Sequence, residues 1–501
     1  MARIQLRGVC VWGFLALFMN YVVAGLFAQE EPSIVSNAES QETPEANAPK
    51  RAHFDPDAVA TGQAAFNRAC ESCHDGARSL DKRKSLSSWR ATIHRMAESD
   101  HAEISPRDVD PIATYLASLS QPTNAADGSA DGTEDVDKDS KFSVFGTVSP
   151  VWRGGGGPGV QYNQFFPEMF LGGYWKGKVV SARAVACTAC HGVGEEAGSL
   201  SRLDVLEAAV NVDLAGLLTG TCLRDWQMSV DAGRFVVPFG AFSAQVNPGV
   251  YRTVSQPLMF NMGQRVGDED LGHPVLPMPF SDEGASLNGS MSLFSDGGIE
   301  PIILTYNGYV VNGLKGNDAG VDFDNLSRDL ASQNNSPSVG GRVTLGNRFL
   351  RIGSSVIGGR FNDNPPSGVF PGRLNYLIYG FDAITRYENL LRFQFEYAQR
   401  NSDFVADPAA LQTDLEKVCG YYFEAEGRFR NDSKFSLLGR WDHQNRNVAP
   451  SELNITEVQR FTYGLNYAVT SNSLLMFNHE IWRPRGQAHI DVFGVRYAVT
   501  F

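Results

Sequence analysis

The chain has 501 residues, of which 43% are hydrophobic and 20% charged, and this composition excludes a mainly disordered protein. Its formal net charge of -13 argues against binding to nucleic acid, because phosphate contacts need a basic surface. At ~150 residues per domain the length would indicate about three domains, but a single large β-barrel exceeds that average.

The N-terminal segment predicts export. Arg3 and Arg7 precede an apolar run over residues 9–27, and small residues then lead into an acidic stretch. This is the pattern of a secretory signal peptide, so residues 1–28 are expected to be cleaved; an uncleaved membrane anchor is the alternative. Residues 29–53, rich in Glu, Ser, Ala and Pro, predict a disordered tether. The exported chain then meets oxidising conditions.

Residues 54–120 show the period of helices. Apolar residues recur at three- and four-residue steps from Val59 to Ala69. Asp110-Pro111 then indicates the start of a second helix, with Asp as the cap and Pro at the first position. The acidic, low-complexity residues 121–141 that follow predict a solvated linker and a domain boundary.

From residue 142 to residue 501 the period changes to two. Apolar and polar residues alternate over 391–398, 421–430, 435–442 and the final segment 489–501. A soluble sandwich would explain this alternation, and so would a membrane barrel with apolar residues facing lipid. Aromatic residues at strand ends and the terminal Phe501 favour an antiparallel transmembrane β-barrel. At roughly 22 residues per strand, it would have about 16 strands.

A first motif lies in the helical segment. Cys70-Glu71-Ser72-Cys73-His74 is a C-x-x-C-H sequence, the attachment signature of haem c. Two thiols one turn apart reach the vinyl groups, and the imidazole binds the iron. A zinc half-site or a redox dithiol is the alternative, but zinc needs a second ligand pair, which this segment lacks. We therefore expect Cys70, Cys73 and His74 to hold a haem.

A second C-x-x-C-H motif, Cys187-Thr188-Ala189-Cys190-His191, falls between the strand-like segments 166–180 and 203–214. It predicts a second haem on Cys187 and Cys190, with His191 as the iron ligand; a chance occurrence or a vicinal disulfide is the alternative. The distal position is open or belongs to one of four candidates: Met169, Met228, His273 and Met278. Counting strands places the motif on the periplasmic side, or folded inward.

Two remaining groups of residues leave alternatives open. Cys222 and Cys419 either pair or remain free and buried, since disulfides have a strict distance limit. Acidic residues in predicted loops either are solvated or collect cations outside: Asp268, Glu269, Asp270, Asp318, Asp322 and Asp324.

The helical segment resembles a class I cytochrome c over residues 54–120. Gly62 and Phe66 match the position where the N-terminal helix of such cytochromes meets the C-terminal helix, here bearing Tyr115 and Leu116. Residues 89–96 resemble the stretch that carries the distal ligand. The resemblance implies Met96 as sixth iron ligand, which would raise the reduction potential; His94 and His101 are rivals.

The whole chain resembles the fused cytochrome–porins of bacteria that oxidise iron outside the cell. Residues 231–240 also resemble a segment of porin-like barrels that accompany multihaem cytochromes. The resemblance implies an outer-membrane protein that transfers electrons between periplasmic carriers and an extracellular donor or acceptor, with ferrous iron as a candidate. It would act as an extracellular metal oxidase or as an electron carrier. The second motif departs from the one-haem pattern of these proteins.

A diffusion porin with an appended periplasmic cytochrome domain is the alternative function, and a soluble dihaem protein is a third. An empty barrel of about 16 strands would leave an aqueous channel, which would defeat insulation. We therefore expect residues 54–120 to plug the lumen or its periplasmic mouth. The inner face that receives them is predicted to be wet and to carry seven charged residues: Arg392, Glu396, Glu424, Glu426, Arg428, Arg440 and Asp442.

Overall fold

The structure is a computed structural model of the chain. It describes residues 55–69, 86, 89–90, 93, 106–119, 141–157, 160–177, 179–188, 203–214, 227–261, 274–293, 302–317, 320–321, 323, 336–347, 349–362, 373–387, 390–407, 412–430, 433–447, 456–470 and 473–501. The predicted signal peptide and tether lie outside these residues, as does nearly all of the predicted linker.

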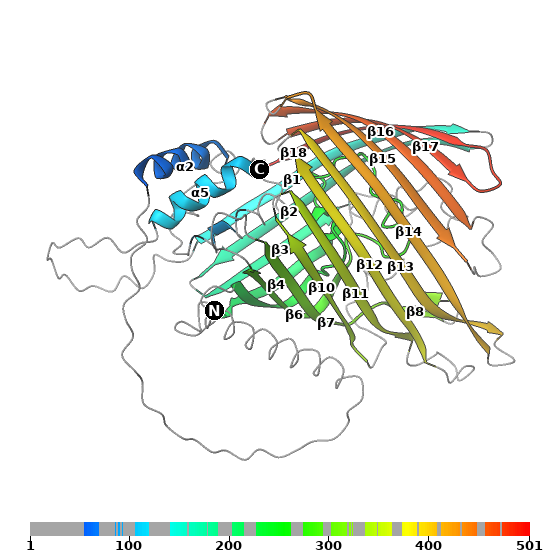
Figure 1. Cartoon of the computed structure of the whole chain (residues 1–501). Coiled ribbons are helices and arrows are strands. Elements are labelled where there is room, and N and C mark those ends of the chain that lie inside the picture. Colours follow the sequence, from blue (N-terminus) through cyan, green and yellow to red (C-terminus); the bar gives the residue numbers. More distant parts are fainter. Residues whose placement is uncertain are drawn as a thin grey trace, which may run out of the picture. The chain divides into compact units, whose positions relative to one another are not determined.

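The described elements comprise helices α2 and α5, a short 3-10 helix η1 and strands β1 to β18 (Figure 1). The helices are α2 Pro56–Ala69, α5 Pro106–Leu119 and η1 Phe242–Gln245. The strands are β1 Lys141–Gly157, β2 Val160–Lys176, β3 Val180–Thr188, β4 Asp204–Asp213, β5 Gln227–Val236, β6 Ser281–Ser292, β7 Ile303–Val311, β8 Gly316–Asn317, β9 Gly320–Val321, β10 Ser338–Gly346, β11 Leu350–Asn362, β12 Leu374–Tyr387, β13 Leu391–Asp407, β14 Gln412–Arg428, β15 Phe435–Arg446, β16 Glu457–Thr470, β17 Ser473–Pro484 and β18 Ile490–Thr500.

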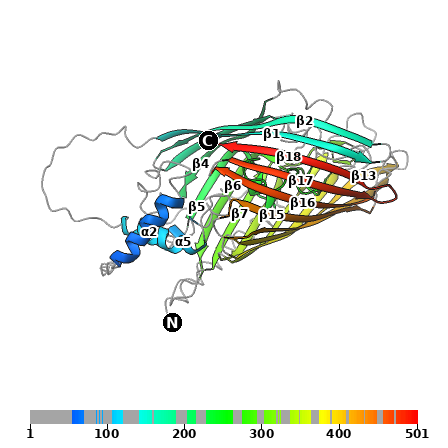
Figure 2. The same cartoon turned by 90° about the horizontal axis from the view of Figure 1, so that it is seen from above.

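Sixteen of the described strands form one closed antiparallel barrel (Figures 1 and 2). Each strand pairs with its neighbours along the chain, except that β8 and β9 form a small sheet of their own and β7 pairs with β10. The barrel closes where β1 pairs with β18, with Thr147 opposite Thr500. The Phe501 N–H donates to the Gly146 carbonyl at 2.9 Å. The predicted strand number is confirmed, and a closed single sheet excludes the soluble sandwich.

The barrel wall is apolar outside and polar inside. Phe423 and Trp441 point outward and are 45% and 37% exposed, whereas Arg440 and Asp442 on the inner face are 3% and 0% exposed. In water this distribution would be unfavourable, because exposed aromatic surface and buried charge both cost free energy. It is stable where lipid surrounds the outer face. The chain is therefore a porin-like β-barrel of the bacterial outer membrane, as predicted.

The two ends of the barrel differ in the length of their connections. Short turns lie at the end where the chain enters β1 and leaves β18, namely 177–179, 347–349, 388–390 and 471–472. The longest connections lie at the opposite end, namely 189–203, 237–280 and 312–337. Outer-membrane barrels have short periplasmic turns and long external loops. The end with the chain termini therefore faces the periplasm, and the other end is external.

The helical segment is described as a packed pair of helices. A Cβ built on Gly62 of α2 would stand 2.1 Å from the Pro111 carbonyl oxygen of α5, so the two backbones touch there. The Phe66 and Tyr115 rings pack with centroids 5.6 Å apart. The predicted contact of Gly62 and Phe66 with the second helix is confirmed. Among the described residues, no helix has the length and apolar character needed to cross a membrane.

The second helix begins earlier than the sequence predicted. Pro106 rather than Pro111 occupies the start of α5, and Pro111 lies inside the helix. Both prolines follow a turn-forming residue, and Pro is favoured at the first helical position, so the pattern alone marks two possible starts. The upstream start is the one adopted, and Pro111 then provides the carbonyl over which Gly62 packs.

Replacing Gly62 with valine should separate α2 from α5, because its new Cβ would overlap the Pro111 carbonyl. Overpacking of this kind costs about 1–3 kcal/mol. We expect faster cleavage between residues 54 and 119 in limited proteolysis of the full chain, and no change in the barrel. Gln63→Ala, at an exposed position of the same helix, is the control. Equal cleavage rates for the two variants would contradict the tight crossing.

Candidate functional site

Most predicted haem ligands lie outside the described residues. They are Cys70, Cys73, His74, Met96, Cys190 and His191, together with the rivals His94, His101 and His273. Cys222 and the acidic residues 268–270, 318, 322 and 324 are also outside. Within the described part of the chain, no group of three or more His, Cys, Asp or Glu side chains is placed to hold a metal. Cys187 and the barrel lumen are the parts of the site that can be built.

Cys187 is a wall residue on the inner face of the barrel. Cys187 pairs with Phe170 of β2, and Phe170 pairs with Thr147 of β1. Residues that stand directly opposite one another in a sheet point to the same face, which is the inner face here. The Cys187 side chain is 0% exposed and packs in an apolar cluster with Phe170, Val185 and Leu206. The second C-x-x-C-H motif therefore begins on the lumen side of the wall.

The sequence predicted this motif in a connection that lies on the periplasmic side or folds inward, and the structure corrects the periplasmic placement. β3 extends through Thr188, so the motif starts inside a strand. A tight turn separates β2 from β3, and it is closed by a hydrogen bond from the Gly177 N–H to the Val180 carbonyl at 2.8 Å. This turn lies within residues 166–180, which were predicted as one strand-like segment. The connection after β3 consequently lies at the external end. A turn this short interrupts the side-chain alternation too little to be seen in the sequence.

The described cysteines differ in their bonding. Cys187 is disulfide-bonded, and its partner cysteine lies outside the described residues. Cys419 of β14 is free and half-buried, so the alternative in which it pairs with Cys222 is wrong. The described candidates for a distal ligand are dispersed: Met169 on β2, Met228 on β5 and Met278 between β5 and β6.

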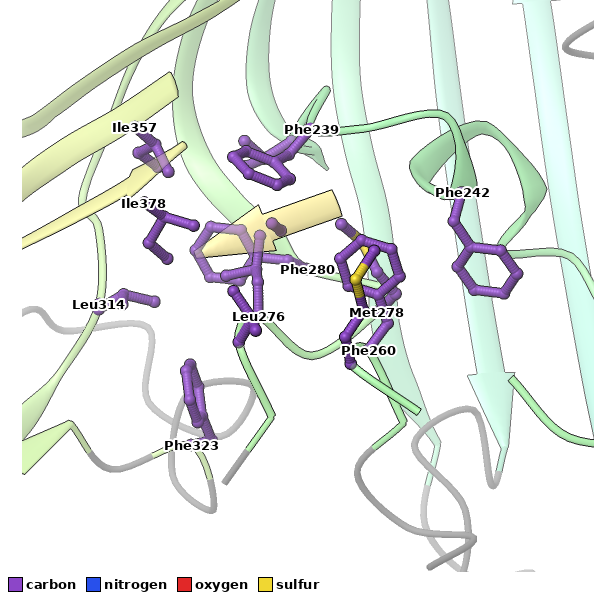
Figure 3. Close-up of a cluster of buried hydrophobic side chains, with 14 of the residues drawn as sticks. Phe239, Phe242, Phe260, Leu276, Met278, Phe280, Leu314, Phe323, Ile357 and Ile378 are labelled. Atoms are coloured by element: carbon purple, nitrogen blue, oxygen red, sulfur yellow. The ribbon is translucent and has the colours of Figure 1, made fainter. Parts of the chain in front are cut away.

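Part of the barrel lumen is occupied by the chain itself. The connection between β5 and β6 turns inward, and we call its described residues, 237–261 and 274–280, the lumen plug. Phe239, Phe260 and Met278 of the plug are 0% exposed and pack with Ile357 and Ile378 of the inner wall in one cluster (Figure 3). An apolar interior of this kind excludes water from the part of the lumen that it occupies.

The plug has ordered internal contacts. Phe242 of η1 stacks on Tyr251 and on Phe260, with centroid distances of 5.8 Å in both cases. The Tyr251 hydroxyl accepts a hydrogen bond from Gln256 at 2.8 Å and donates one to the Val246 carbonyl at 3.2 Å. Burial raises the pKa of Tyr251 well above its usual value, so the phenol stays neutral. The plug is thus a folded unit of structure and not a loose loop.

Wall arginines hold the plug through its backbone carbonyls. Arg440 donates to the Ser255 carbonyl at 3.0 Å and Arg460 to the Gln256 carbonyl at 2.6 Å. Elsewhere on the wall, Arg496 donates to Val254 at 2.6 Å and Arg400 to Pro274 at 2.9 Å. Hydrogen bonds from a charged donor contribute about 1.5–3 kcal/mol each when buried. These four guanidinium groups therefore position the plug on the wall.

Wall carboxylates bind the plug through its N–H groups. Asp442 accepts from Leu258 at 2.9 Å, and Glu396 accepts from Phe242 at 3.2 Å. At Gly240, whose φ is +65°, a Cβ would stand 1.6 Å from a Glu396 oxygen. Only glycine tolerates both this conformation and this approach. The plug consequently follows one specific path over the wall.

The same wall charges are paired with one another. Asp442 lies 3.0 Å from both Arg440 and Arg460, and Arg392 lies 2.7 Å from Glu424. Removing one partner of a buried pair typically costs 3–5 kcal/mol. Asp442, Arg440, Arg460, Arg392 and Glu424 are therefore stabilised by an opposite charge beside each of them.

The predicted inner face is confirmed in orientation but not in hydration. Six of its seven charged residues are 8% exposed or less, namely Arg392, Glu396, Glu424, Glu426, Arg440 and Asp442. Four of them, Glu396, Glu426, Arg440 and Asp442, contact the plug directly. The connection between β5 and β6 occupies this part of the lumen, and a plug of residues 54–120 at the lumen or its periplasmic mouth stays a prediction.

The opposite sector of the inner wall is less deeply buried. Asp231 of β5 accepts from Asn211 and Asn288 at 2.6 Å each, and Asn307 donates to Asn288 at 2.7 Å. These four side chains are half-buried and carry only polar groups. This sector, formed by β4 to β7, is therefore the less deeply buried side of the inner wall.

Comparison with known proteins found similarity only to solved structures, and at low identity. No protein-family model and no curated protein sequence matches the chain. Among solved structures, it is similar to the outer-membrane protein OmpT of Vibrio cholerae, at 8% identity and a TM-score of 0.41, over 74% of this chain and 100% of that one. It is also similar to OmpF of Salmonella typhi in complex with daunomycin, at 12% identity and a TM-score of 0.46, over 72% and 97%. At such values the function has to be argued from the residues of this chain.

Replacing residues 241–258 with a short Gly-Ser linker should open the barrel. The strands and their closure stay intact, while the exposed inner charges become hydrated and line a channel, as in empty barrels of this size. We expect single-channel conductance in planar bilayers to rise from near zero to that of a water-filled pore.

Two variants serve as controls for this experiment. Replacing residues 448–455, between β15 and β16 at the same end, should leave the conductance low. Deleting residues 51–120 should also leave it low. A plug variant that stays closed, or a pore that opens only on deletion of 51–120, would show that the seal lies in the N-terminal segment instead.

Proposed function

We propose that this protein carries electrons across the outer membrane on covalently bound haem, between periplasmic carriers and an extracellular donor or acceptor. The observation that carries the proposal is the position of Cys187. A haem-attachment motif begins on the inner wall of a barrel whose lumen is filled by its own chain. A filled barrel suits a conduit for electrons better than a path for solutes.

The residues around Cys187 fit a haem group chemically. Two thiols and an imidazole at C-x-x-C-H spacing provide covalent attachment and an iron ligand. Phe170, Val185 and Leu206 offer apolar surface suited to the faces of a porphyrin. When bound, haem supplies an iron that takes up and releases one electron. A sulfur in a disulfide cannot also form a thioether, so the two states of Cys187 exclude each other.

The helical segment supports a first haem on Cys70 and Cys73, with His74 and Met96 as proposed ligands. Its two described helices pack as the resemblance to class I cytochromes implies, with Gly62 at the crossing. Their core includes Trp89 and Ile93, which flank the stretch that leads to Met96. The role of these helices would be to enclose the group attached between them.

Ferrous iron is the external donor that we propose, which would make the protein an extracellular metal oxidase. Oxidised iron precipitates at neutral pH, so a route that moves only electrons keeps the solid outside the cell. The outward apolar wall and the lumen plug together supply the insulation that such a route needs. The alternative, a diffusion porin with an appended cytochrome domain, requires a continuous aqueous path, and the buried inner face around Arg440 and Asp442 disfavours one.

The number of haems per chain tests both motifs. A pyridine haemochrome assay should give two haems for the native chain and one for Cys187→Ala, because that variant cannot form the second pair of thioether bonds. Cys419→Ala removes the free thiol and should retain two. A native chain with a single haem would mean that Cys187 remains in its disulfide and that the second site does not exist.

Electron transfer itself can be measured in sealed proteoliposomes. With a redox dye inside and a membrane-impermeant reductant outside, the native chain should reduce the dye. The double variant Cys70→Ala/Cys73→Ala should slow this reduction strongly. Uptake of labelled sugars serves as the second readout. Rapid sugar uptake together with dye reduction that ignores the haem cysteines would establish the diffusion porin and overturn the conduit.

A further inference from the structure

A polar and basic row crosses the outward face of the barrel near its external end. Four aromatic residues stand opposite one another on neighbouring strands, and we call them the aromatic belt: Phe395, Phe423, Trp441 and Phe461. The polar row runs directly beside this belt. The row lies one step further toward the external connections and comprises Tyr397, Tyr421, His443, Gln459 and Arg483. Because side chains two apart on a strand share a face, the row points outward like the belt.

Ring contacts fix this row against the belt. The Arg483 guanidinium lies over the Phe461 ring at 5.2 Å from its centroid. The Tyr421 ring stacks on His443 at 4.9 Å and meets Trp441 edge-on at 5.4 Å. Aromatic side chains with a polar end mark the boundary between hydrocarbon and head groups. The row therefore lies at head-group level on the external side.

Basic groups outnumber acidic groups around this row. The Glu457 carboxylate lies close to two basic groups. Its oxygens are 3.2 Å from His443 Nε2 and 3.6 Å from Arg485 Nη1. On the neighbouring strands, Asp491 lies 2.8 Å from His479 and 3.5 Å from His489. Lys417 and Arg483 add two exposed cations. Of these cations, Lys417 and Arg483 form no ion pair with a described residue.

We infer that this row, with Arg483 and Arg485 as its main contacts, binds the phosphate groups of a phosphorylated glycolipid in the outer leaflet. Guanidinium groups suit phosphate oxygens because they donate two parallel hydrogen bonds. Arg485 is 72% exposed, and its solvent-exposed ion pair with Glu457 at 3.6 Å is weak enough to exchange for a head-group phosphate. Acyl chains below the phosphate would lie on the aromatic belt, which a soluble phosphate would leave uncovered.

The test compares two double variants in neutral detergent. Arg483→Gln/Arg485→Gln removes two cations from the row. Arg430→Gln/Lys434→Gln removes two exposed cations from the turn between β14 and β15, at the periplasmic end. Each protein is titrated with bisphosphorylated lipid A, and bound lipid is counted by native mass spectrometry. At about fivefold in affinity for each interfacial cation, the first variant should bind about 25-fold more weakly, and the second should bind like the native chain.

Further arms identify the source of the phosphate. Lipid A without phosphates should bind all three proteins equally, and inorganic phosphate in the millimolar range should displace little lipid. Native affinity in the Arg483/Arg485 variant, or an equal loss in both variants, would overturn the inference. Efficient displacement by inorganic phosphate would show a site for the free anion instead. Retained heat-modifiability on gels verifies that each barrel is folded, and the result does not depend on haem loading.

Discussion

The charged inner wall of the barrel has to be matched by something inside it. Lipid outside forces the apolar side chains outward, and strand alternation then directs every second residue into the lumen. On β13 to β17 those residues include many Arg, Glu and Asp side chains, several of which bind the plug. Arg440 illustrates the result, because it contacts a wall carboxylate on one side and plug carbonyls on the other. The plug and the wall charges depend on each other.

The inner wall has two sectors that differ in how deeply they are buried. The sector around Asp231 is lined by amide groups and is half-buried, while the sector around Asp442 is packed against the plug and insulates. The insulating sector is held by guanidinium groups that bind backbone atoms, so it tolerates changes in plug side chains better than changes in the wall. A conduit for electrons benefits from this arrangement because ions and solutes do not follow the electrons.

The outer wall shows a related division along its height. Aromatic side chains such as Trp441 meet hydrocarbon, and beside them His443 and Arg483 meet the head-group region on the external side. The same strands thus carry a buried charge network inside and a lipid boundary outside. Consecutive residues of one strand serve the two faces. Asp442 points inward to the charge network, while Trp441 and His443 on either side of it point outward to the lipid.

The sequence by itself determined the class of fold, the helical segment and the position of the attachment motifs. Period-two alternation over 360 residues is enough to predict a barrel, because the side-chain direction in a strand is local. The pairing of Gly62 with the second helix was also predicted, through the resemblance of this segment to class I cytochromes c. The exact strand boundaries were not, as the turn at Gly177 shows. Cys187 moved from a predicted connection to a wall position for that reason.

Only the tertiary structure decided what fills the lumen. Residues 237–261 and 274–280 are apolar and rich in proline, with Pro238, Pro257 and Pro277 among them. That composition is unsuited to a strand and too apolar for an exposed loop, yet it does not say where the segment goes. Its place is set by partners far away in the chain, such as Glu396 under Gly240 and Arg460 at Gln256. Such contacts are invisible in the sequence because they depend on the closed barrel, which first brings those wall residues together around one interior.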